Sequence, residues 1–517
     1  MFQKQIRIPW LYFTLLGALF ITIMNYHFFG QIYQQLDSDS SFMLKASFFI
    51  IYFGLLTSIF ALVFVPYLTK VLILFLLWIV CLTAYFMSAY GVVIDKDMFV
   101  NVLRTDTTEA FSLLSPSLLL FVALLGVLPT LLILKVRIVY FMGRWKKTLV
   151  VRIATFLLSL IMAGSLFYAY SQTIIPFFRN HRFLRAYETP VHQIYSVIKY
   201  IKQEVLPARE FELIATDATL APSDKKRLLI FVVGETARAE NYSFAGYTLN
   251  ETNAYTQKDS VVFFGDFSSC GTSTAISVPC MFSDLKRENF SYATYYRENV
   301  LDILHKLGVN VVWIDNNTSG CQGVCKNLEK VKLFKEPYDE VLLNAIAEPL
   351  KELKDQNLIV LHLQGSHGPT YFQRYPDSFK RFTPTCDTNE LQKCTKEQLT
   401  NTYDNTILYT DFLLHSLIKL LQDEQEYEGT LIYVSDHGES LGENGIYLHG
   451  MPYFLAPKEQ IHVPFIFFSE NAELMEIAQM RKDLPLSHDI IFSTLLGFFG
   501  VESAVYQKQD DLFRREK

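Results

Sequence analysis

The chain has 517 residues, enough for more than one domain, and 50% of them are hydrophobic. Its formal net charge is −6, so it has no overall positive field of the kind that attracts nucleic acid, and nucleic-acid binding is not expected. The apolar residues are concentrated in the first third, which indicates a membrane domain followed by a water-soluble part.

Five apolar stretches in that first third are long enough to cross a bilayer, which takes about 20 residues. One such stretch could be a buried helix of a soluble protein, and the first could be an uncleaved signal sequence. Four more follow the first, however, and no small-residue cleavage site is evident, so the pattern predicts a multi-pass membrane domain. The stretches cover roughly residues 10–29, 46–66, 71–90, 117–134 and 153–170.

Basic residues indicate which loops face the cytoplasm, because cytoplasmic loops are rich in lysine and arginine. Lys4 and Arg7 precede the first span, and Lys70 lies between the second and third. The loops at about 30–45 and 91–116 hold few basic residues, whereas the connection between spans four and five holds Lys135, Arg137, Arg144, Lys146, Lys147 and Arg152. The amino terminus is therefore expected in the cytoplasm, and everything after the fifth span is expected outside it.

Cysteine usage agrees with export of the second part. Cys81 lies alone in the third span and is expected to be a small core residue. The other six fall where disulfides persist, namely Cys270, Cys280, Cys321, Cys325, Cys386 and Cys394. Of 15 possible connectivities, sequence proximity favours 270–280, 321–325 and 386–394, each contributing about 2–3 kcal/mol. A cysteine zinc site is the competing interpretation, but the spacings do not form paired C-x-x-C knuckles.

Residues of about 171–222 form a connecting region. Apolar residues recur at helical spacing over 191–205, which favours a helix on the membrane surface or against the next domain, with an ordinary packing helix as the alternative. The hydrophilic stretch that ends this region precedes the exported domain, residues 223–517, and the transmembrane domain covers 1–170.

From Leu228 onward, short apolar runs alternate with helical patterns. Helices are expected at 300–307, 339–353 and 402–422. The alternation predicts an α/β fold with a mostly parallel sheet between helices. The expected strands are 228–233, 309–314, 358–363, 430–434 and 463–468.

One edge of this sheet is expected to collect polar side chains, because ligands bind beyond the carboxyl ends of parallel strands. Glu235, Asp315, His367 and the pair Asp436 and His437 each follow a predicted strand. Zinc usually takes four ligands, which include carboxylate oxygen and imidazole nitrogen. Glu235, Asp436 and His437 can supply three ligands, and a hydroxyl group can supply the fourth.

The segment between Cys270 and Cys280 offers hydroxyl groups at Thr272, Ser273 and Thr274. Serine and threonine are poor nucleophiles at neutral pH unless a base or a metal lowers the pKa of the hydroxyl. The segments together predict a metal-activated nucleophile that handles phosphoryl groups. The residues alone do not choose among the three hydroxyls.

His367 and His449 both lie in glycine-bounded loops. They can bind a second zinc ion, contact a substrate phosphate or protonate a leaving group. The alternative is a loop histidine that is hydrogen-bonded to backbone. Glu439 and Glu443 are expected to support a turn or the ligands rather than to bind metal.

Three long segments resemble the phosphoethanolamine transferases that modify lipid A, a family that includes the polymyxin-resistance enzymes of Gram-negative bacteria. The segments are GETARAENYS at 234–243, CGTSTAISVPCMFS at 270–283 and SDHGESLGENG at 435–445. The resemblance covers nearly the whole chain. It implies a multi-pass inner-membrane protein, an alkaline-phosphatase-like catalytic domain in the periplasm and one tightly bound zinc ion, with a second during turnover left open.

By this resemblance the zinc ligands are Glu235, Thr274, Asp436 and His437. Thr274 is then the nucleophile that carries a covalent phosphoethanolamine. His367 and His449 match histidines of the family's substrate site.

The resemblance also implies residues that bind the lipid donor: Asn101, Thr105, Glu109 and Thr318. The spacing of four would put the first three on one face of a helix outside the membrane. One departure concerns a lysine found in some members after the Asp-Asn-Asn motif. Here the segment 315–325 has a cysteine-bridged loop with Gln322 instead, so phosphate contacts from this loop are not implied.

The implied reaction transfers phosphoethanolamine from phosphatidylethanolamine to a phosphate of lipid A, and a monomer in contact with membrane lipids is expected. The added ammonium would weaken the binding of cationic peptides such as polymyxin. Two alternatives remain: phosphoethanolamine or glycerophosphate transfer to another envelope glycan, and a non-catalytic membrane sensor that binds zinc or lipid. A sulfatase is not expected, because the chain lacks the C/S-x-P-x-R setting at the nucleophile.

Overall fold

The computed structural model describes residues 6–38, 40–105, 107–140, 145–205 and 210–514. Contacts within the chain divide it into two compact units. The helical unit comprises Met1–Asp95 and Leu114–Ile198, and the sheet unit comprises Lys96–Leu113 and Lys199–Lys517. The segment after the fourth helix, Lys96–Leu113, therefore packs as part of the sheet unit.

Four helices of the helical unit are long and apolar enough to cross a membrane. A fifth span results if α1 (Trp10–Met24) and α2 (Tyr26–Gln35), which are bent by 54° at their junction, are taken as one. The predicted five spans agree with this count by length and composition. The four helices are α3 (Phe42–Val63), α4 (Leu68–Tyr90), Pro116–Lys135 (α7, Pro116–Val122; a π-helical turn, Ala123–Val127; α8, Leu128–Lys135) and α9 (Trp145–Ala169).

The bend between α1 and α2 lies at Asn25, which is buried. Its Nδ2 donates hydrogen bonds to the carbonyl oxygens of Ile21 (2.9 Å) and Thr189 (2.6 Å). Its Oδ1 accepts from the backbone N–H of Thr189 at 2.8 Å. A buried polar side chain needs such partners. The first span is therefore tied to the segment that follows the last span, a feature that the hydropathy pattern does not predict.

Shorter elements follow α9. They are α10 (Ser171–Asn180), a 3-10 helix (Arg182–Tyr187) and α11 (Val191–Tyr200), which a π-helical turn at Ile201–Val205 extends over the predicted helix at 191–205. An unpredicted parallel pair joins β1 (Ile6–Pro9) to β2 (Val136–Val139). Of the basic residues expected in the cytoplasm, Lys4 and Arg144 lie outside the described residues.

The core of the sheet unit is a seven-stranded sheet with the order β5-β13-β10-β4-β9-β7-β8. Strands β10, β4, β9, β7 and β8 pair in parallel, whereas β13 is antiparallel to both of its neighbours. The predicted mostly parallel sheet is confirmed, with strands at all five predicted places. The strands are β4 (Arg227–Gly234), β5 (Val262–Phe264), β7 (Asn310–Asp315), β8 (Lys330–Leu333), β9 (Gln356–His362), β10 (Glu428–Ser435) and β13 (Phe465–Ser469).

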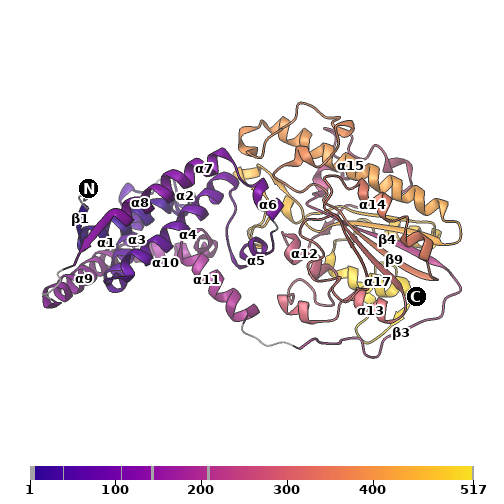
Figure 1. Ribbon diagram of the computed structural model, residues 1–517, viewed down its shortest axis with the longest axis horizontal. Coiled ribbons are helices and arrows are strands. Elements are labelled where there is room, and N and C mark those ends of the chain that lie inside the picture. Colours follow the sequence, from indigo (N-terminus) through magenta and orange to yellow (C-terminus); the bar gives the residue numbers. More distant parts are fainter. Residues whose placement is uncertain (1–5, 39, 106, 141–144, 206–209, 515–517) are drawn as a thin grey trace, which may run out of the picture. The chain divides into compact units, whose positions relative to one another are not determined.

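Helices cover both faces of this sheet. On β4, Phe231 and Val233 pack with α12, α13, α16 and α17, whereas Ile230 and Val232 pack with α14 and α15. Figure 1 shows α14 and α15 on one face of the sheet and α12, α13 and α17 on the other. These helices are α12 (Thr274–Met281), α13 (Val300–Lys306), α14 (Glu340–Ala345), α15 (Lys396–Asp423), α16 (Ala472–Arg481) and α17 (Ile491–Phe499).

Two of the predicted helices differ in extent. α15 begins at Lys396 rather than at 402, because Thr395 and Gln398 form a capping box at its start. The helix expected over 339–353 is divided into α14 and a 3-10 helix at Pro349–Glu352. Pro349 explains the division, since proline lacks the N–H that would continue the α-helical hydrogen bonds to Ala345.

The single helix expected over Asn101, Thr105 and Glu109 is also divided. Asn101 lies in α5 (Lys96–Arg104), and Glu109 falls within α6 (Thr107–Ser112). Threonine loses side-chain freedom in a helix, so a threonine-rich stretch favours a break here.

The three predicted disulfides are present, and Cys81 is a buried free cysteine. They join Cys270 to Cys280, Cys321 to Cys325 and Cys386 to Cys394. Short strand pairs fix further loops of the sheet unit: β3 (Thr219–Leu220) with β15 (Val501–Glu502), β6 (Phe267–Ser268) with β14 (Leu486–Ser487), and β11 (Ser440–Leu441) with β12 (Tyr447–Leu448).

Candidate functional site

Two neighbouring strands of the sheet deliver the carboxylates of the candidate site. β4 and β10 pair in parallel, with Gly234 opposite Ser435. The residues that follow, Glu235 and Asp436, therefore leave the sheet side by side, as the sequence predicts for one edge. Together with His437 they bring one ligand atom each to within 4.8 Å of one another, and all three are buried.

Asp436 has one satisfied and one open carboxylate oxygen. Its Oδ1 accepts hydrogen bonds from the backbone N–H groups of Thr236 (3.1 Å) and His437 (2.7 Å). Its Oδ2 is buried, and within the described part of the chain no group donates a hydrogen bond to it. Buried carboxylate oxygens are normally paired. The open Oδ2 therefore suits a bound cation.

The orientation of His437 fits the same interpretation. Its Nδ1 lies 2.9 Å from the carbonyl oxygen of Gly438, which can only accept, so Nδ1 carries the proton. Nε2 then presents a lone pair, 3.5 Å from Oε1 of Glu235 and 3.4 Å from Oδ2 of Asp436. Carboxylate oxygens and a neutral imidazole nitrogen are zinc-type ligands. The donor set therefore fits a metal ion.

Electrostatics also favour a cation here. Burial raises the pKa of Asp436 to about 6, and the neighbouring Glu235 carboxylate adds to the rise. Burial also opposes ionisation of Glu235, but without a metal ion the positive charges of protonated His437 and His367 outweigh burial and lower the pKa of Glu235 to about 2. The two carboxylates thus destabilise each other when both are charged. A bound cation would remove that penalty.

Thr274 places a hydroxyl against this cluster. It begins α12, and its Oγ1 donates a hydrogen bond to Oε2 of Glu235 at 3.1 Å and lies 3.4 Å from Nε2 of His437. The hydroxyl of Thr272 instead donates to the carbonyl oxygen of Met451 at 2.7 Å. The geometry therefore separates two hydroxyls that the residues alone do not distinguish.

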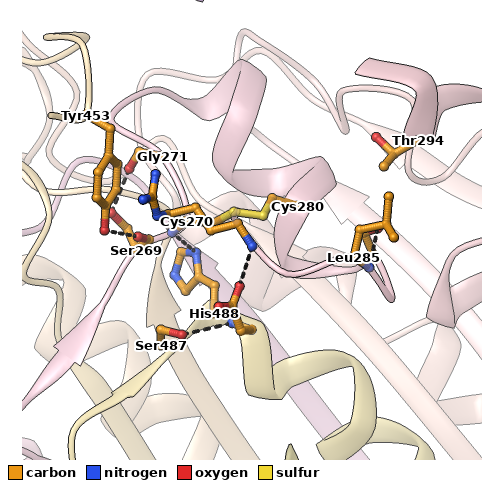
Figure 2. Close-up of a disulfide and its surroundings, with 12 residues drawn as sticks. Ser269, Cys270, Gly271, Cys280, Leu285, Thr294, Tyr453, Ser487 and His488 are labelled. Atoms are coloured by element: carbon orange, nitrogen blue, oxygen red, sulfur yellow. Dashed lines mark hydrogen bonds between the residues drawn. A yellow bond between two sulfur atoms is a disulfide. The ribbon is translucent and has the colours of Figure 1, made fainter. Parts of the chain in front are cut away.

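The loop that carries Thr274 is held at both ends. The Cys270–Cys280 disulfide links the start of the loop to the end of α12, and Figure 2 shows the ring of His488 beside Cys270. His488 accepts a hydrogen bond from the backbone N–H of Cys270 at 3.1 Å, and its Nε2 donates to the carbonyl oxygen of Ser435 at 3.0 Å. His488 thus joins the loop that carries Thr274 to β10, the strand that ends at Ser435. Sequence reasoning missed it.

Asn317 is a second residue that sequence reasoning missed. Its Nδ2 donates to Oε2 of Glu235 at 2.6 Å and to the carbonyl oxygen of Leu363 at 3.0 Å. The signal was present in the Asp-Asn-Asn run after β7. Asp315, which was expected at the metal edge, instead accepts from the backbone N–H of Asn317 (2.8 Å) and from Nε1 of Trp313 (2.8 Å).

A third missed residue, Asp339, is buried and binds two loops at once. It accepts hydrogen bonds of 2.9 Å from Nδ2 of Asn316 and from the backbone N–H groups of Gln364 and Gly365. Gly365 packs against Glu235: a Cβ atom there would lie 2.7 Å from the Glu235 carbonyl oxygen. Asp339 therefore helps to fix the backbone around Glu235.

The two predicted loop histidines gather beside the cluster. The ring centroid of His449 lies 4.3 Å from that of His437 and 5.7 Å from that of His367. Glu439, buried behind them, lies 2.9 Å from Nδ1 of His449 and accepts a hydrogen bond from the hydroxyl of Tyr371. Glu439 thus orients His449 rather than joining the metal cluster, as expected.

The remaining glutamate, Glu443, forms an ion pair of 2.7 Å with the buried Arg238. It also accepts from the backbone N–H of Leu441 at 2.7 Å. These contacts hold the turn after β11. They match the supporting role expected for Glu443.

Of the four residues predicted to bind the lipid donor, the structure describes the contacts of only some. The backbone N–H of Thr318 donates a hydrogen bond to Oε1 of Gln364 at 3.1 Å, and the hydroxyl of Thr105 donates to the carbonyl oxygen of Asn101 at 2.9 Å. The side chain of Glu109 lies outside the described part of the chain. The structure therefore does not bring these four residues together in one described contact set.

Arg104 supplies a cation near the loop that lacks the expected lysine. Its guanidinium donates to Oε1 of Gln322 at 2.9 Å and lies 4.1 Å from the ring centroid of Tyr295. Arg104 is one of the few basic residues in the loop at about 91–116, and the sequence alone assigns it no partner. A signal was its place three residues before the Thr-Thr-Glu run that begins at Thr107.

Two family models match the chain: "Phosphoethanolamine transferase EptA/EptB" over residues 52–205 and "Sulfatase" over residues 227–501. Phosphoethanolamine transferase EptA of Escherichia coli (strain K12) is 38% identical, with 99% of this chain and 98% of that protein covered. Phosphatidylethanolamine transferase Mcr-1 of Escherichia coli is 40% identical over 84% of each chain. The structure of the integral membrane protein lipooligosaccharide phosphoethanolamine transferase A (EptA) from Neisseria meningitidis matches with a TM-score of 0.92 and 32% identity over 98% of each chain.

Proposed function

This chain belongs to the phosphoethanolamine transferase family, and we propose that it transfers phosphoethanolamine from phosphatidylethanolamine to a phosphate of lipid A through a covalent adduct on Thr274. The observation that carries the proposal is the contact of the Thr274 hydroxyl with Glu235 at 3.1 Å, inside the cluster with Asp436 and His437. The names of two relatives support the substrates: Mcr-1 is a phosphatidylethanolamine transferase, and the Neisseria protein is a lipooligosaccharide phosphoethanolamine transferase.

Glu235, Asp436 and His437 would hold one zinc ion, with the Thr274 hydroxyl as the fourth ligand. When bound, zinc supplies Lewis-acid chemistry, which lowers the pKa of a hydroxyl and offsets negative charge on phosphoryl oxygens. The positive end of the α12 dipole adds to this stabilisation, because Thr274 is the first residue of the helix.

In the first half-reaction, Oγ1 of Thr274 releases its proton to solvent and attacks the phosphorus of phosphatidylethanolamine. A bond forms between Oγ1 and phosphorus as the bond from phosphorus to the diacylglycerol oxygen breaks. His449 is oriented by Glu439 through Nδ1, so its Nε2 would give a proton to that departing oxygen. Diacylglycerol leaves, and phosphoethanolamine stays on Thr274.

In the second half-reaction, an oxygen of a lipid A phosphate attacks the same phosphorus. The bond from phosphorus to Oγ1 breaks, and Thr274 and His449 each take up a proton from solvent. His367 would contact the incoming phosphate, because its ring lies beside that of His449. The product carries an added ammonium group, which weakens the binding of cationic peptides such as polymyxin.

The membrane helices would keep both lipid substrates within reach of the site. In this proposal the transmembrane domain is residues 1–170, the bridging region is 171–222, and the catalytic domain, 223–517, lies in the periplasm of a Gram-negative cell. The monomer is the working unit.

The test compares Thr274→Ala with Thr272→Ala, which removes a neighbouring hydroxyl that contacts Met451 instead. With fluorescent phosphatidylethanolamine, Thr274→Ala is expected to lose at least about 1,000-fold in turnover, and Thr272→Ala far less. Mass spectrometry of the trapped wild-type enzyme should show phosphoethanolamine on the peptide that contains Thr274. A glycerophosphate adduct would favour the glycerophosphate alternative, and absence of turnover by the wild type would favour a sensor.

A further inference from the structure

The helical unit contains a pocket of about 460 Å³ that the proposed reaction does not use. It is built by residues from two places in the chain, the second half of the bent first span and the segment after the last span. Six residues line it: Phe28, Phe178, His181, Arg182, Arg185 and Glu188. A pocket with two arginines and two phenylalanines combines positive charge with an apolar wall.

Local backbone geometry aims the two arginines in the same direction. Arg182 and Arg185 both lie in the 3-10 helix Arg182–Tyr187. Such a helix has three residues per turn, so side chains three apart lie one above the other. Leu184 and Ala186 of the same helix are buried and anchor it against the unit. The arginine side is therefore the exposed side, facing the pocket.

The arginines are not neutralised by protein carboxylates. Among the described residues, none forms an ion pair with Arg182 or Arg185, and Glu188 is the acidic residue of the pocket. Glu188 is engaged elsewhere, since it accepts a hydrogen bond from the hydroxyl of Tyr52 at 2.7 Å. Burial also raises the pKa of Glu188 to about 6. With Glu188 ionised, two guanidinium groups still leave the pocket with a net positive charge.

The place of these arginines runs against the usual distribution of charge. They follow the last span directly, at the end of the bundle predicted to face away from the cytoplasm. Basic residues near span ends are enriched on the cytoplasmic side instead. Arginines at the opposite end need another reason, and recognition of a phosphate group is the one their geometry suits, because a guanidinium binds phosphate oxygens in pairs.

Apolar surface near the pocket fits the rest of a lipid. The buried cluster beneath the pocket joins α2, the start of α3, α10 and the 3-10 helix. At this end of the unit, Phe42 is 81%, Met43 67% and Ile175 55% exposed. In a bilayer these side chains would contact acyl chains. Phe28 and Phe178 continue the apolar surface into the pocket.

We propose that this pocket binds the phosphate of an anionic phospholipid from the outward-facing leaflet of the membrane. The net single positive charge matches a phosphodiester monoanion such as that of phosphatidylglycerol. The ammonium of phosphatidylethanolamine would instead be repelled by Arg182 and Arg185. The inference rests on the membrane placement of the helical unit in the proposed function, but not on Thr274 chemistry.

The test measures lipid binding to the full-length protein in mixed micelles by native mass spectrometry. The probes are phosphatidylglycerol, phosphatidylethanolamine and lipid A at equal mole fractions. We expect phosphatidylglycerol to bind best and to bind about tenfold more weakly to Arg182→Gln and to Arg185→Gln. Arg179→Gln is the matched control, because Arg179 is an exposed arginine of α10 that does not line the pocket.

Three further variants make the result decisive. Arg182→Lys and Arg185→Lys keep the charge but lose the paired guanidinium donors, so they should bind more weakly than the wild type and more tightly than the Gln variants, which separates loss of charge from loss of folding. Thr274→Ala should keep phosphatidylglycerol binding while losing transfer, which separates this inference from the proposed reaction. Equal phosphatidylglycerol binding by the two Gln variants and Arg179→Gln would overturn the inference. Arginine-dependent preference for phosphatidylethanolamine or lipid A would overturn the choice of lipid.

Discussion

The side-chain amide of Asn317 donates a 2.6 Å hydrogen bond to Oε2 of Glu235, the same oxygen that accepts from Thr274. This contact fixes the carboxylate that would hold both the metal and the nucleophile. Hydrogen bonds of this kind to a metal ligand typically contribute about 10–100-fold to metal affinity or activity. Asn317 is therefore expected to affect metal binding although it is not itself a proposed ligand.

We predict that Asn317→Ala weakens zinc binding and transfer by about 10–100-fold, because the Glu235 carboxylate loses its orienting donor. Zinc titration of the metal-free protein and turnover of fluorescent phosphatidylethanolamine would measure both effects. Part of the activity should return at high zinc concentration. The control is Asn327→Ala, whose amide contacts Asp302 at 3.3 Å instead. Unchanged zinc affinity in Asn317→Ala would contradict the prediction.

Chelation of the metal should abolish transfer and lower the midpoint of thermal unfolding, because a ligand that binds only the folded state stabilises it. Asp436→Asn should bind zinc poorly and be inactive. Its metal-free form, however, should be at least as stable as the metal-free wild type, because Asn removes one of two mutually repelling buried carboxylates. Differential scanning calorimetry of the wild type and Asp436→Asn, each with and without zinc, measures the stabilisation by zinc and the stability of each metal-free protein. A metal-free Asp436→Asn protein that unfolds well below the metal-free wild type would refute this account.

His488 predicts a pH dependence of stability. Burial lowers its pKa from 6.5 in the unfolded chain to about 3. The unfolded chain therefore binds more protons between these values, so the stability contributed by neutral His488 is complete above about pH 6.5 and is lost as the pH falls toward 3. His488→Gln should lower stability at neutral pH and flatten its dependence between these values.

The measurement for His488 is the midpoint of thermal unfolding across that pH range. His305→Gln provides the control, since His305 lies on α13, away from the strand ends. A His488→Gln protein with the same acid dependence as the wild type would show that other groups dominate the titration.

Asp339→Ala should destabilise the sheet unit, because it leaves the buried N–H groups of Gln364 and Gly365 without their acceptor. Each unpaired group costs about 1–3 kcal/mol. Turnover should also fall, since the backbone next to Glu235 is no longer fixed. Denaturant unfolding and transfer assays would measure the two effects, with Asp377→Ala as a surface control. Wild-type stability in Asp339→Ala would be incompatible with this role.

Much of the candidate site could be predicted because its residues follow strands. Glu235, Asp436 and His437 come directly after β4 and β10, and parallel pairing brings them to one edge. The choice of Thr274 over Thr272 needed either the family resemblance or the structure, because both hydroxyls lie in the same short loop. The sequence pattern placed strands reliably where they were continuously apolar.

The rest depends on contacts between distant segments. Asn317 and Asp339 act through hydrogen bonds to loops that only the folded sheet brings near, so no local pattern marks them. The bend at Asn25 was not predicted for the same reason. A hydropathy average over an apolar stretch hides a single polar side chain. The division of the predicted helix at 339–353 was readable from Pro349.

The amide of Asn25 has a consequence for biogenesis. Its partner, Thr189, is 164 residues further along the chain. During synthesis the first hydrophobic segment therefore inserts long before the group that satisfies its buried amide has been made. The helical bundle can be completed only after the segment that carries Thr189 has been synthesised. Replacement of Asn25 would consequently reduce the yield of correctly inserted protein more than the turnover of each molecule that matures.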